Sequence, residues 1–594
     1  MLDLLIRGGT VVDGTGASGF RGDVGIRDGS IVAVGDIDEP ARQRLDANGL
    51  VVAPGFVDIH THYDAQLFWD PFASPSPLHG VTTVIGGNCG FSLAPAGREH
   101  AAYLMRMLAR VEGMPLEALQ TGLDWDWTSF GGWLDRLQGR IAVNAGFLAG
   151  HSAVRRVVMG DAATAERASE RQIEEMARLL HRAISDGALG FSTSQSPTHS
   201  DWDSNPVPSR LAAAEEMLAL AAVVGDHPGT TLELILPGCL SGFTPEEVEL
   251  MASISLAGNR PVNWNVLGVS AANPDAHVHQ LDASTRAAER GARVIALTLP
   301  HSMRVRLSFL SGFILDALPG WRQVMSRPVA ERMQALSDPA VRRRLAEGAA
   351  SPEAGILRGL SNWGRLELVE TFAEKNQALA GRSVGSVAGE LGKEPFDALL
   401  DIVVADELRT GISPPDTTGS DEDWRLRAEV WRDPRTIVGG SDSGAHLDMM
   451  CGAIYSTSLL GNAVRDRGLL SLEEAVHQLT DVPARLYGLR GRGRLSEGWR
   501  ADIVVFDPGE VGHGPERTRH DLPAGAPRLY ADAVGIRHVL VNGGEIVRDG
   551  AFTGAMPGRL LRSDVDTETV AVPGGAQAAG SGSGVEAGQD GGAA

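Results

Sequence analysis

The feature that most constrains the fold of this 594-residue chain is an alternation of short apolar runs with longer amphipathic stretches, from residue 57 to residue 440. Eight runs have the length and composition of strands, at 57–62, 82–86, 141–147, 188–193, 230–236, 261–267, 293–298 and 435–440. Helical patterning fills most intervals, for example 166–186 and 209–224. Eight strands alternating with helices predict an α/β fold, a (β/α)8 TIM-like barrel with its active site at the carboxyl ends of the strands. A doubly wound open sheet is the alternative.

The two ends of the chain share a different pattern, in which short β-rich runs are separated by glycine-containing turns. These runs are residues 4–7, 10–12, 24–27 and 31–34 near the start, and 501–506, 539–542 and 545–547 near the end. The Asp-Gly and Gly-Gly pairs between them are typical of hairpin turns. We therefore expect a small β-sandwich formed by residues 1–54 and 489–571, with the barrel at 55–488 between its two parts.

Two further segments fall outside these patterns. Residues 300–434 separate the seventh and eighth predicted strands, and we expect an insertion there, with helices at 329–336 and 366–376, that could act as a lid. Residues 572–594 are rich in Gly, Ala, Ser and Gln and have no apolar period, which predicts a disordered tail.

Charge and cysteine content exclude several classes of protein. The chain has 53 Lys and Arg against 75 Asp and Glu, a net charge of −22, so we expect neither nucleic acid nor a membrane as a partner. Three cysteines are too few for a disulfide scaffold. No apolar run approaches the roughly eighteen residues that a membrane span requires. These features predict a cytoplasmic globular protein and leave its oligomeric state open.

The strongest local signal is the pair His60 and His62 at the end of the first predicted strand. Residues i and i+2 of a strand point to the same side, so both imidazoles would be directed at one point in the mouth of the barrel. Zinc and similar metals favour imidazole nitrogen, so the pair would form half of a metal site. The alternative is that these are two ordinary histidines at a strand end. The residues at the ends of the neighbouring strands distinguish the two interpretations.

Two neighbouring strand ends carry further reactive groups. The second strand runs into a glycine-rich loop with Cys89, whose thiolate would be a strong ligand able to bridge two ions. A small buried thiol in a tight turn is the alternative. The eighth strand runs into a loop with Asp442, a carboxylate placed to act as general base and then general acid beside a metal-activated water. A turn or helix-capping role is the alternative for this residue.

With these motifs the chain resembles the amidohydrolase superfamily, and within it the N-acyl-D-amino-acid deacylase (D-aminoacylase) branch. The matching stretches are residues 4–14 with 28–29, 54–64, 80–95, 150–155, 187–193, 439–446, 491–507 and 541–550. The resemblance implies a β-sandwich of both termini, a barrel carrying one or two zinc ions or another divalent metal, and hydrolysis of a small-molecule amide by metal-activated water. It implies that His60, His62 and Cys89 are metal ligands and that Asp442 is the catalytic acid and base.

The lysine content bears on how two ions would be bridged. Many members of the superfamily use a carboxylated lysine for this purpose. The chain has two lysines, Lys375 and Lys393, and both lie in the predicted insertion, away from any strand end. Cys89 is therefore the candidate bridge.

The chain also departs from the branch at strands five and six, where the branch has histidines. Residues 231–236 and 263–267 contain none. Glu233 and Asn265 stand near those places and could supply oxygen ligands, and His301, just after strand seven, is a further reserve ligand. The departure favours a single metal site over a binuclear one. His277 and His279 are expected on the solvated surface of a helix.

Recognition of the substrate is less clear from the sequence. The branch binds its substrate carboxylate with basic residues, but residues 447–458 contain no Arg or Lys. Arg155 matches a family position and would either contact an anionic group or form a structural ion pair. His446 and Asn265 are further candidates for substrate contact.

The function expected from this resemblance is metal-dependent hydrolysis of a non-peptide C–N bond, like that of a D-aminoacylase. One alternative is hydrolysis of a cyclic amide or of another C–N bond. The other is a catalytically inactive barrel that acts as a binding protein. The presence of His60, His62, Cys89 and Asp442 together argues against inactivity.

Overall fold

The structure is a computed structural model that describes residues 1–302, 304–312, 314–416 and 418–575. Parallel strands form the centre of the molecule, with β6 pairing β7 and β7 pairing β8, and a second run in the order β9-β10-β11-β12-β13-β17. Their bounds are β6 Phe56–Asp58, β7 Val81–Gly86, β8 Asn144–Phe147, β9 Ala149–Gly150, β10 Gly190–Ser194, β11 Thr231–Ile235, β12 Val262–Leu267, β13 Val294–Thr298 and β17 Thr436–Val438.

Two seams close these strands into a barrel. At the first, β8 and β9 are successive parts of one strand, interrupted at Leu148. At the second, the segment after β6 meets the segment after β17: Thr61 forms a parallel bridge with Ser443, and the Asp442 N–H donates to the His60 carbonyl at 3.1 Å. The predicted (β/α)8 barrel is thereby confirmed, and the open sheet is wrong.

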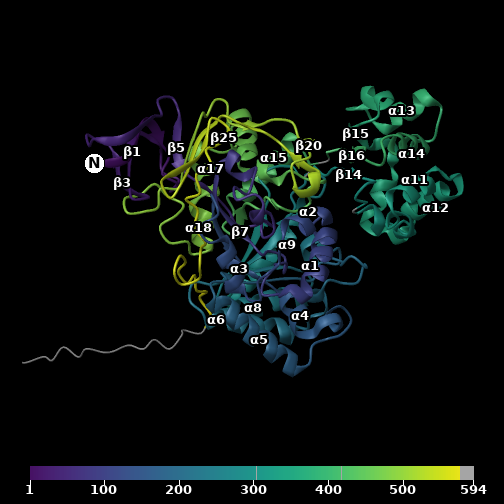
Figure 1. The fold of residues 1–594 in the computed structure, drawn as a ribbon, viewed down its shortest axis with the longest axis horizontal. Helices are drawn as coiled ribbons and strands as arrows, with labels where there is room; N and C mark the ends of the chain where they lie inside the picture. Colours follow the sequence, from purple (N-terminus) through teal and green to yellow (C-terminus); the bar gives the residue numbers. More distant parts are fainter. Residues whose placement is uncertain (303, 313, 417, 576–594) are drawn as a thin grey trace, which may run out of the picture.

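Helices cover the outside of the barrel (Figure 1). Those between its strands are α1 Arg98–Val111, α2 Leu116–Gly122, α3 Phe130–Leu137, α4 His151–Met159, α5 Glu170–Ser185, α6 Ala214–Gly225, α7 Gly238–Ser241, α8 Pro245–Gly258 and α9 Pro274–Glu289. Capping boxes begin α5, at Ser169, and α8, at Thr244. In the part of the chain that the structure describes, no helix is long and apolar enough to cross a membrane.

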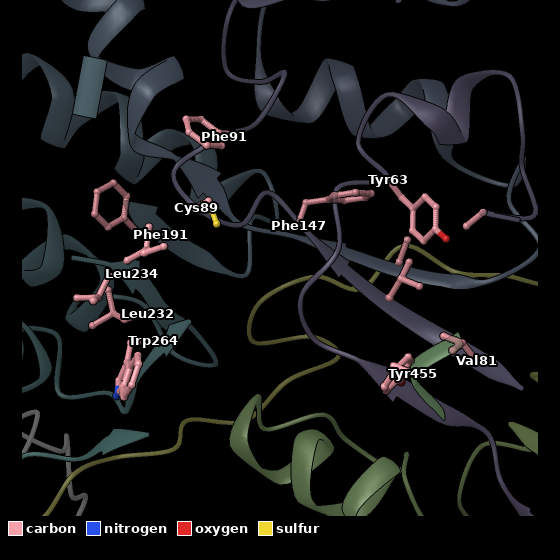
Figure 2. Packing of buried hydrophobic residues seen from close by; sticks show 14 of the residues in the cluster. Tyr63, Val81, Cys89, Phe91, Phe147, Phe191, Leu232, Leu234, Trp264 and Tyr455 are labelled. Atoms are coloured by element: carbon pink, nitrogen blue, oxygen red, sulfur yellow. The ribbon is translucent and has the colours of Figure 1, made fainter. Parts of the chain in front are cut away.

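The alternation of side chains along the barrel strands decides what faces the site. Leu232 and Leu234 of β11 and Trp264 of β12 belong to the apolar layer between strands and helices (Figure 2). Because successive residues of a strand point to opposite faces, Glu233 and Asn265 must point into the barrel. A separate buried cluster, which includes Val57, Ile85, Leu148, Leu189, Ile295, Leu297 and Ile437, fills the barrel interior.

Strands from both chain ends form one sheet, in the order β25-β24-β23-β18-β5-β1-β2-β3, with β4 also paired to β1. The bounds are β1 Leu2–Val11, β2 Phe20–Arg27, β3 Ser30–Gly35, β4 Ala41–Asp46, β5 Val51–Pro54, β18 Ile503–Phe506, β23 Ile536–Val541, β24 Gly544–Arg548 and β25 Ala551–Phe552. Where the sequence predicts two strands at 4–12, the structure has the single strand β1, whose register shifts between Ile6 and Gly9.

Most of the segment between β13 and β17 forms a lobe of its own beside the barrel, whereas its last helix, α15 Asp421–Trp431, packs with the main core (Figure 1). The lobe contains β14 Leu307–Ser308, α10 Arg322–Met325, α11 Val329–Ser337, α12 Pro339–Ala350, β15 Glu367–Glu370, α13 Val384–Leu391, α14 Pro395–Ala405 and β16 Gly411–Ser413. Most of these elements pack around a separate apolar core with Trp321, Phe309 and Leu399. The helix expected at 366–376 is wrong: the segment begins as β15, which pairs with β16.

After β17 the chain returns to the barrel and then to the sheet. It forms α16 Tyr455–Ser458, a π-helix at Leu459–Asp466, α17 Leu472–Leu479 and α18 Asp481–Leu486, and later two short pairs, β19 Gly512–His513 with β22 Ala533–Val534 and β20 Arg517–Arg519 with β21 Arg528–Tyr530.

The predicted disordered tail is wrong for its first residues. Val572 is buried, its N–H donates to Oδ1 of Asn259 at 3.2 Å, and the Gly574 N–H donates to the Gly291 carbonyl at 2.8 Å. The rest of that prediction, residues 576–594, lies outside the described residues.

Candidate active site

The end of the first barrel strand supplies two imidazoles. Although β6 is shorter than predicted, the residues after it are held from both sides, by hydrogen bonds from the Thr61 N–H to the Ile85 carbonyl (3.0 Å) and from the His62 N–H to the Ser443 carbonyl (2.7 Å). His60 and His62 therefore reach the same region, with ring centroids 5.4 Å apart, and both are buried.

Cys89 reaches the same region from the loop after β7. A glycine is required at position 87, because its φ is +74° and a Cβ there would lie 2.2 Å from the Leu148 carbonyl oxygen. The Sγ of Cys89 lies 3.6 Å from Nε2 of His60. The ligand atoms of His60, His62 and Cys89 all lie within 4.8 Å of one another. The structure thus brings together the three residues that the sequence nominates as metal ligands.

Asp442 joins the cluster from the loop after β17. Its Oδ1 lies 3.0 Å from Nε2 of His62 and 3.4 Å from Nε2 of His60. Burial opposes ionisation here, but the neighbouring imidazoles of His60, His62 and His446 hold the pKa of Asp442 well below its usual range. The side chain is therefore a carboxylate at neutral pH.

The donor set fits a zinc ion. Burial, together with the nearby carboxylates of Glu233, Glu112 and Asp442, raises the pKa of the Cys89 thiol well above its usual value. The thiol therefore keeps its proton unless a cation takes the place of that proton. Imidazole nitrogen, cysteine sulfur and carboxylate oxygen are the donors that zinc takes in proteins.

Glu233, Asn265 and His301 are the reserve candidates for metal or substrate contact. Oε2 of Glu233 accepts the Cys89 N–H at 2.8 Å, and Nδ2 of Asn265 donates to the Cys89 Sγ at 3.3 Å. Burial raises the pKa of Glu233 to about 7 and lowers that of His301, in the loop after β13, to about 4. Within the described part of the chain, neither Glu233 nor His301 joins the close group of ligand atoms. A second ion would depend on oxygen ligands from Glu233 and Asn265.

A cavity of about 280 Å³ opens over the cluster. Its polar wall contains His60, His62, Cys89, Glu112, His199, Asn265, His301, Arg304, Asp442, His446, Asn462, His513 and Glu516. Its apolar wall contains Ile235, Val266, Leu297, Leu299, Trp424, Met450 and Ile454. The predicted contacts Asn265 and His446 are therefore both at the cavity, and Nε2 of His446 lies 3.7 Å from Oδ2 of Asp442.

Arg155 is not at this cavity. The side chain is fully buried on α4, where Nη1 pairs with Glu216 and Nη2 donates to the Glu166 carbonyl at 2.9 Å. Its prediction as a substrate contact is wrong, because the guanidinium is used in a structural ion pair. The solvated position expected for His277 is also wrong, since this residue is buried on α9, whereas His279 is exposed.

Several cavity residues escaped the sequence analysis, among them Glu112, His199 and Arg304, which have charged or imidazole side chains. Glu112 directly follows α1, His199 lies in the loop after β10, and Arg304 lies in the loop after β13. None of them belongs to a recognisable spacing, and only Arg304 could have been found, as a basic residue close to a predicted strand end.

The comparisons with known proteins agree with this geometry. The model of the amidohydrolase family matches residues 43–547. This chain belongs to the amidohydrolase family. It is therefore a hydrolase of C–N bonds other than peptide bonds, and the resemblance inferred from the sequence is confirmed.

Individual relatives cover nearly the whole of this amidohydrolase. It is 29% identical to a D-aminoacylase from Alcaligenes xylosoxydans xylosoxydans, over 94% of this chain and 97% of that protein. It is 30% identical to an N-acyl-D-glutamate deacylase from the same organism, over 95% and 97%. A crystal structure of N-acyl-D-glutamate deacylase from Bordetella bronchiseptica, complexed with zinc and a phosphonate inhibitor, superposes with a TM-score of 0.62 at 25% identity, covering 95% of this chain and all of that one.

Proposed function

We propose that this amidohydrolase deacylates N-acyl-D-amino acids at a zinc centre held by His60, His62 and Cys89, with Asp442 as acid and base. The convergence of three ligand atoms within 4.8 Å, with the Asp442 carboxylate against both imidazoles, carries this proposal. The similarity to a D-aminoacylase and to an N-acyl-D-glutamate deacylase supports the substrate class.

The residues of the site divide the reaction between them. Zinc, when bound, acts as a Lewis acid that polarises the amide carbonyl and makes water a better nucleophile. Asp442 accepts the proton that the attacking water loses, because its carboxylate lies against both imidazoles of the proposed ion site. The same carboxyl group then donates this proton to the departing nitrogen, so that the C–N bond breaks and a carboxylic acid and an amine are released. His446 lies beside the second carboxylate oxygen of Asp442, Oδ2, and orients this side chain.

The walls of the cavity suit the two ends of such a substrate. The apolar wall, formed by Trp424, Leu299 and Met450 among others, would take the acyl group and exclude water from it. Among the described lining residues Arg304 is the one with a guanidinium or ammonium group. Its ion pair with Glu367 is 3.5 Å long and exposed on both sides, so a substrate carboxylate can compete for it.

A substrate panel tests this proposal. The zinc-loaded protein is offered N-acetyl-D-amino acids, their L-enantiomers, hydantoins and lactams, and the released amine or opened ring is measured before and after treatment with a chelator. We expect chelator-sensitive release of D-amino acids. Turnover of hydantoins or lactams alone would replace the deacylase proposal with ring opening, and no turnover of any compound would favour an inactive barrel.

A further inference from the structure

Glu112 is a buried acid at the site that is neither a proposed metal ligand nor the proposed acid and base. Its side chain is 3% exposed and lines the cavity. In the part of the chain that the structure describes, the basic groups that it faces are two imidazoles. Oε1 lies 3.6 Å from Nδ1 of His62, and Oε2 lies 3.8 Å from Nε2 of His446. Burial, together with the carboxylates of Asp442, Asp64 and Glu233, raises the pKa of Glu112 well above its usual value, so this acid is costly to ionise unless a positive or proton-donating group faces it.

The main chain fixes where this carboxylate stands. The Glu112 N–H donates to the Leu108 carbonyl at 2.9 Å and so ends α1, while the Glu112 carbonyl accepts the N–H of His446. Its side chain is thus placed between the carboxyl end of a helix and the loop after β17.

The orientation of the His62 ring shows what the Glu112 side chain can do at this position. Its Nε2 faces Asp442 and the other ligand atoms, and its Nδ1 faces Glu112. An imidazole that binds a cation through Nε2 must carry its proton on Nδ1. Oε1 of Glu112 is the acceptor beside that nitrogen, within about half an ångström of hydrogen-bond length. By contrast, Nδ1 of His60 is buried and makes no hydrogen bond to the described residues.

We propose that Glu112 is a positioning residue for the metal centre: it holds the proton of His62 on Nδ1 and so presents Nε2 to the ion. This inference rests on the proposed function, because it requires zinc at His60, His62 and Cys89. Carboxylates that hold ligating histidines in this way typically contribute 10- to 100-fold to metal affinity.

The test compares zinc binding with fold stability in the full-length protein. The Glu112→Gln variant keeps the shape of the side chain but cannot take up a negative charge beside His62. We expect its zinc Kd, measured by competition with a chromogenic chelator, to rise about 10- to 100-fold. We also expect the metal-free variant to unfold at the same temperature as the metal-free wild type or above it, because an amide carries no charge that must be desolvated.

Glu117→Gln is the matched control, since this glutamate is exposed on α2, and its zinc Kd should stay at the wild-type value. A zinc Kd of Glu112→Gln within about twofold of wild type would overturn the inference. So would a weaker affinity accompanied by a lower unfolding temperature of the metal-free variant, which would make Glu112 a support of the fold. If the wild-type protein itself bound no zinc, the proposed function would fail, and this inference with it.

Discussion

At the scale of single residues, the backbone holds the reactive side chains in a strained conformation. Cys89, Asp442 and His446 have φ values of 56°, 56° and 49°. Such left-handed residues cost on the order of 1–3 kcal/mol and persist where the surrounding structure fixes them, often at functional sites. The sequence could predict which residues stand at the strand ends. It could not predict this conformation, because Asp and His adopt it fairly often but Cys does not.

Replacing Asp442 by Asn separates proton transfer from metal binding. The amide keeps the shape of the side chain and tolerates the left-handed backbone, but it cannot accept a proton near neutral pH. We expect kcat to fall by about 10²- to 10⁴-fold, with zinc content and the unfolding temperature almost unchanged. Activity, zinc stoichiometry and the unfolding midpoint are measured on one preparation. Activity within about tenfold of wild type would make Asp442 a turn residue, and loss of zinc would make it a ligand.

Replacing Cys89 by Ser tests the thiolate. A hydroxyl is a much weaker ligand than a thiolate for zinc, so we expect zinc binding and activity to be lost together. Cys239→Ser is the control, because this thiol is also buried but lies outside the cavity. Zinc analysis of both dialysed variants decides the matter. Equal zinc content in the two would show that Cys89 only fills a tight turn.

At the scale of elements, the loop after β13 connects two environments. Arg304 lines the metal cavity, whereas Arg306 pairs with Glu370 at 2.9 Å and lines a second, outer cavity of about 650 Å³. The two arginines therefore form a matched pair, of which only Arg304 can contact a substrate at the metal centre.

Changing Arg304 to Gln should alter specificity more than catalysis. If Arg304 binds the substrate carboxylate, kcat/KM for an N-acyl-D-amino acid should fall about 10- to 100-fold, the usual cost of a lost charged hydrogen bond. The value for the corresponding uncharged amino-acid amide should hardly change. The same ratio is measured for Arg306→Gln, which should behave as wild type. An unchanged preference of Arg304→Gln for the charged substrate would remove Arg304 from substrate recognition.

A buried histidine connects three elements and makes their packing sensitive to pH. Nδ1 of His79 bonds with Oγ1 of Thr457 at 2.7 Å, and Nε2 bonds with the Ala531 carbonyl at 3.1 Å. Burial lowers the pKa of His79 from 6.5 to about 4. Since the unfolded chain takes up this proton more readily, the contribution of His79 to folding is complete above pH 6.5 and is lost as the pH falls toward 4.

We therefore expect the His79→Gln variant to lose less stability than wild type between pH 7.5 and pH 4.5, by about 2–3 kcal/mol. Urea unfolding at the two pH values measures the difference. His279→Gln, on the exposed side of α9, should follow the wild-type pH dependence. Parallel curves for His79→Gln and wild type would show that this imidazole does not contribute to the acid sensitivity.

At the scale of the whole molecule, the parts that the sequence predicts are those in which burial repeats regularly. The barrel strands are apolar because both of their faces are covered, and each was found within a few residues. β4 was missed because its sequence is mostly polar and, among the described strands, it pairs with β1 alone. Glu112 was missed because it follows a helix rather than a strand, so no spacing places it beside His62.

Zinc should stabilise the whole protein, because its proposed ligands come from two separate loops, one after β6 and one after β7. A ligand present at about 100 times its Kd adds about 2.7 kcal/mol to the free energy of unfolding. We expect a higher unfolding temperature with zinc than with a chelator, measured by calorimetry. This increase should vanish in Cys89→Ser. An equal increase in that variant would place the ion at another site.

The second seam of the barrel is made by the reactive loops themselves, through the bonds between His60 and Asp442 and between His62 and Ser443. These partners are separated by most of the chain, so during synthesis the first loop leaves the ribosome long before the last one exists. As long as Asp442 has not been synthesised, the barrel wall of the nascent chain is open and the site is incomplete. The last reactive loop and the closure of the wall are therefore acquired in the same late step of synthesis.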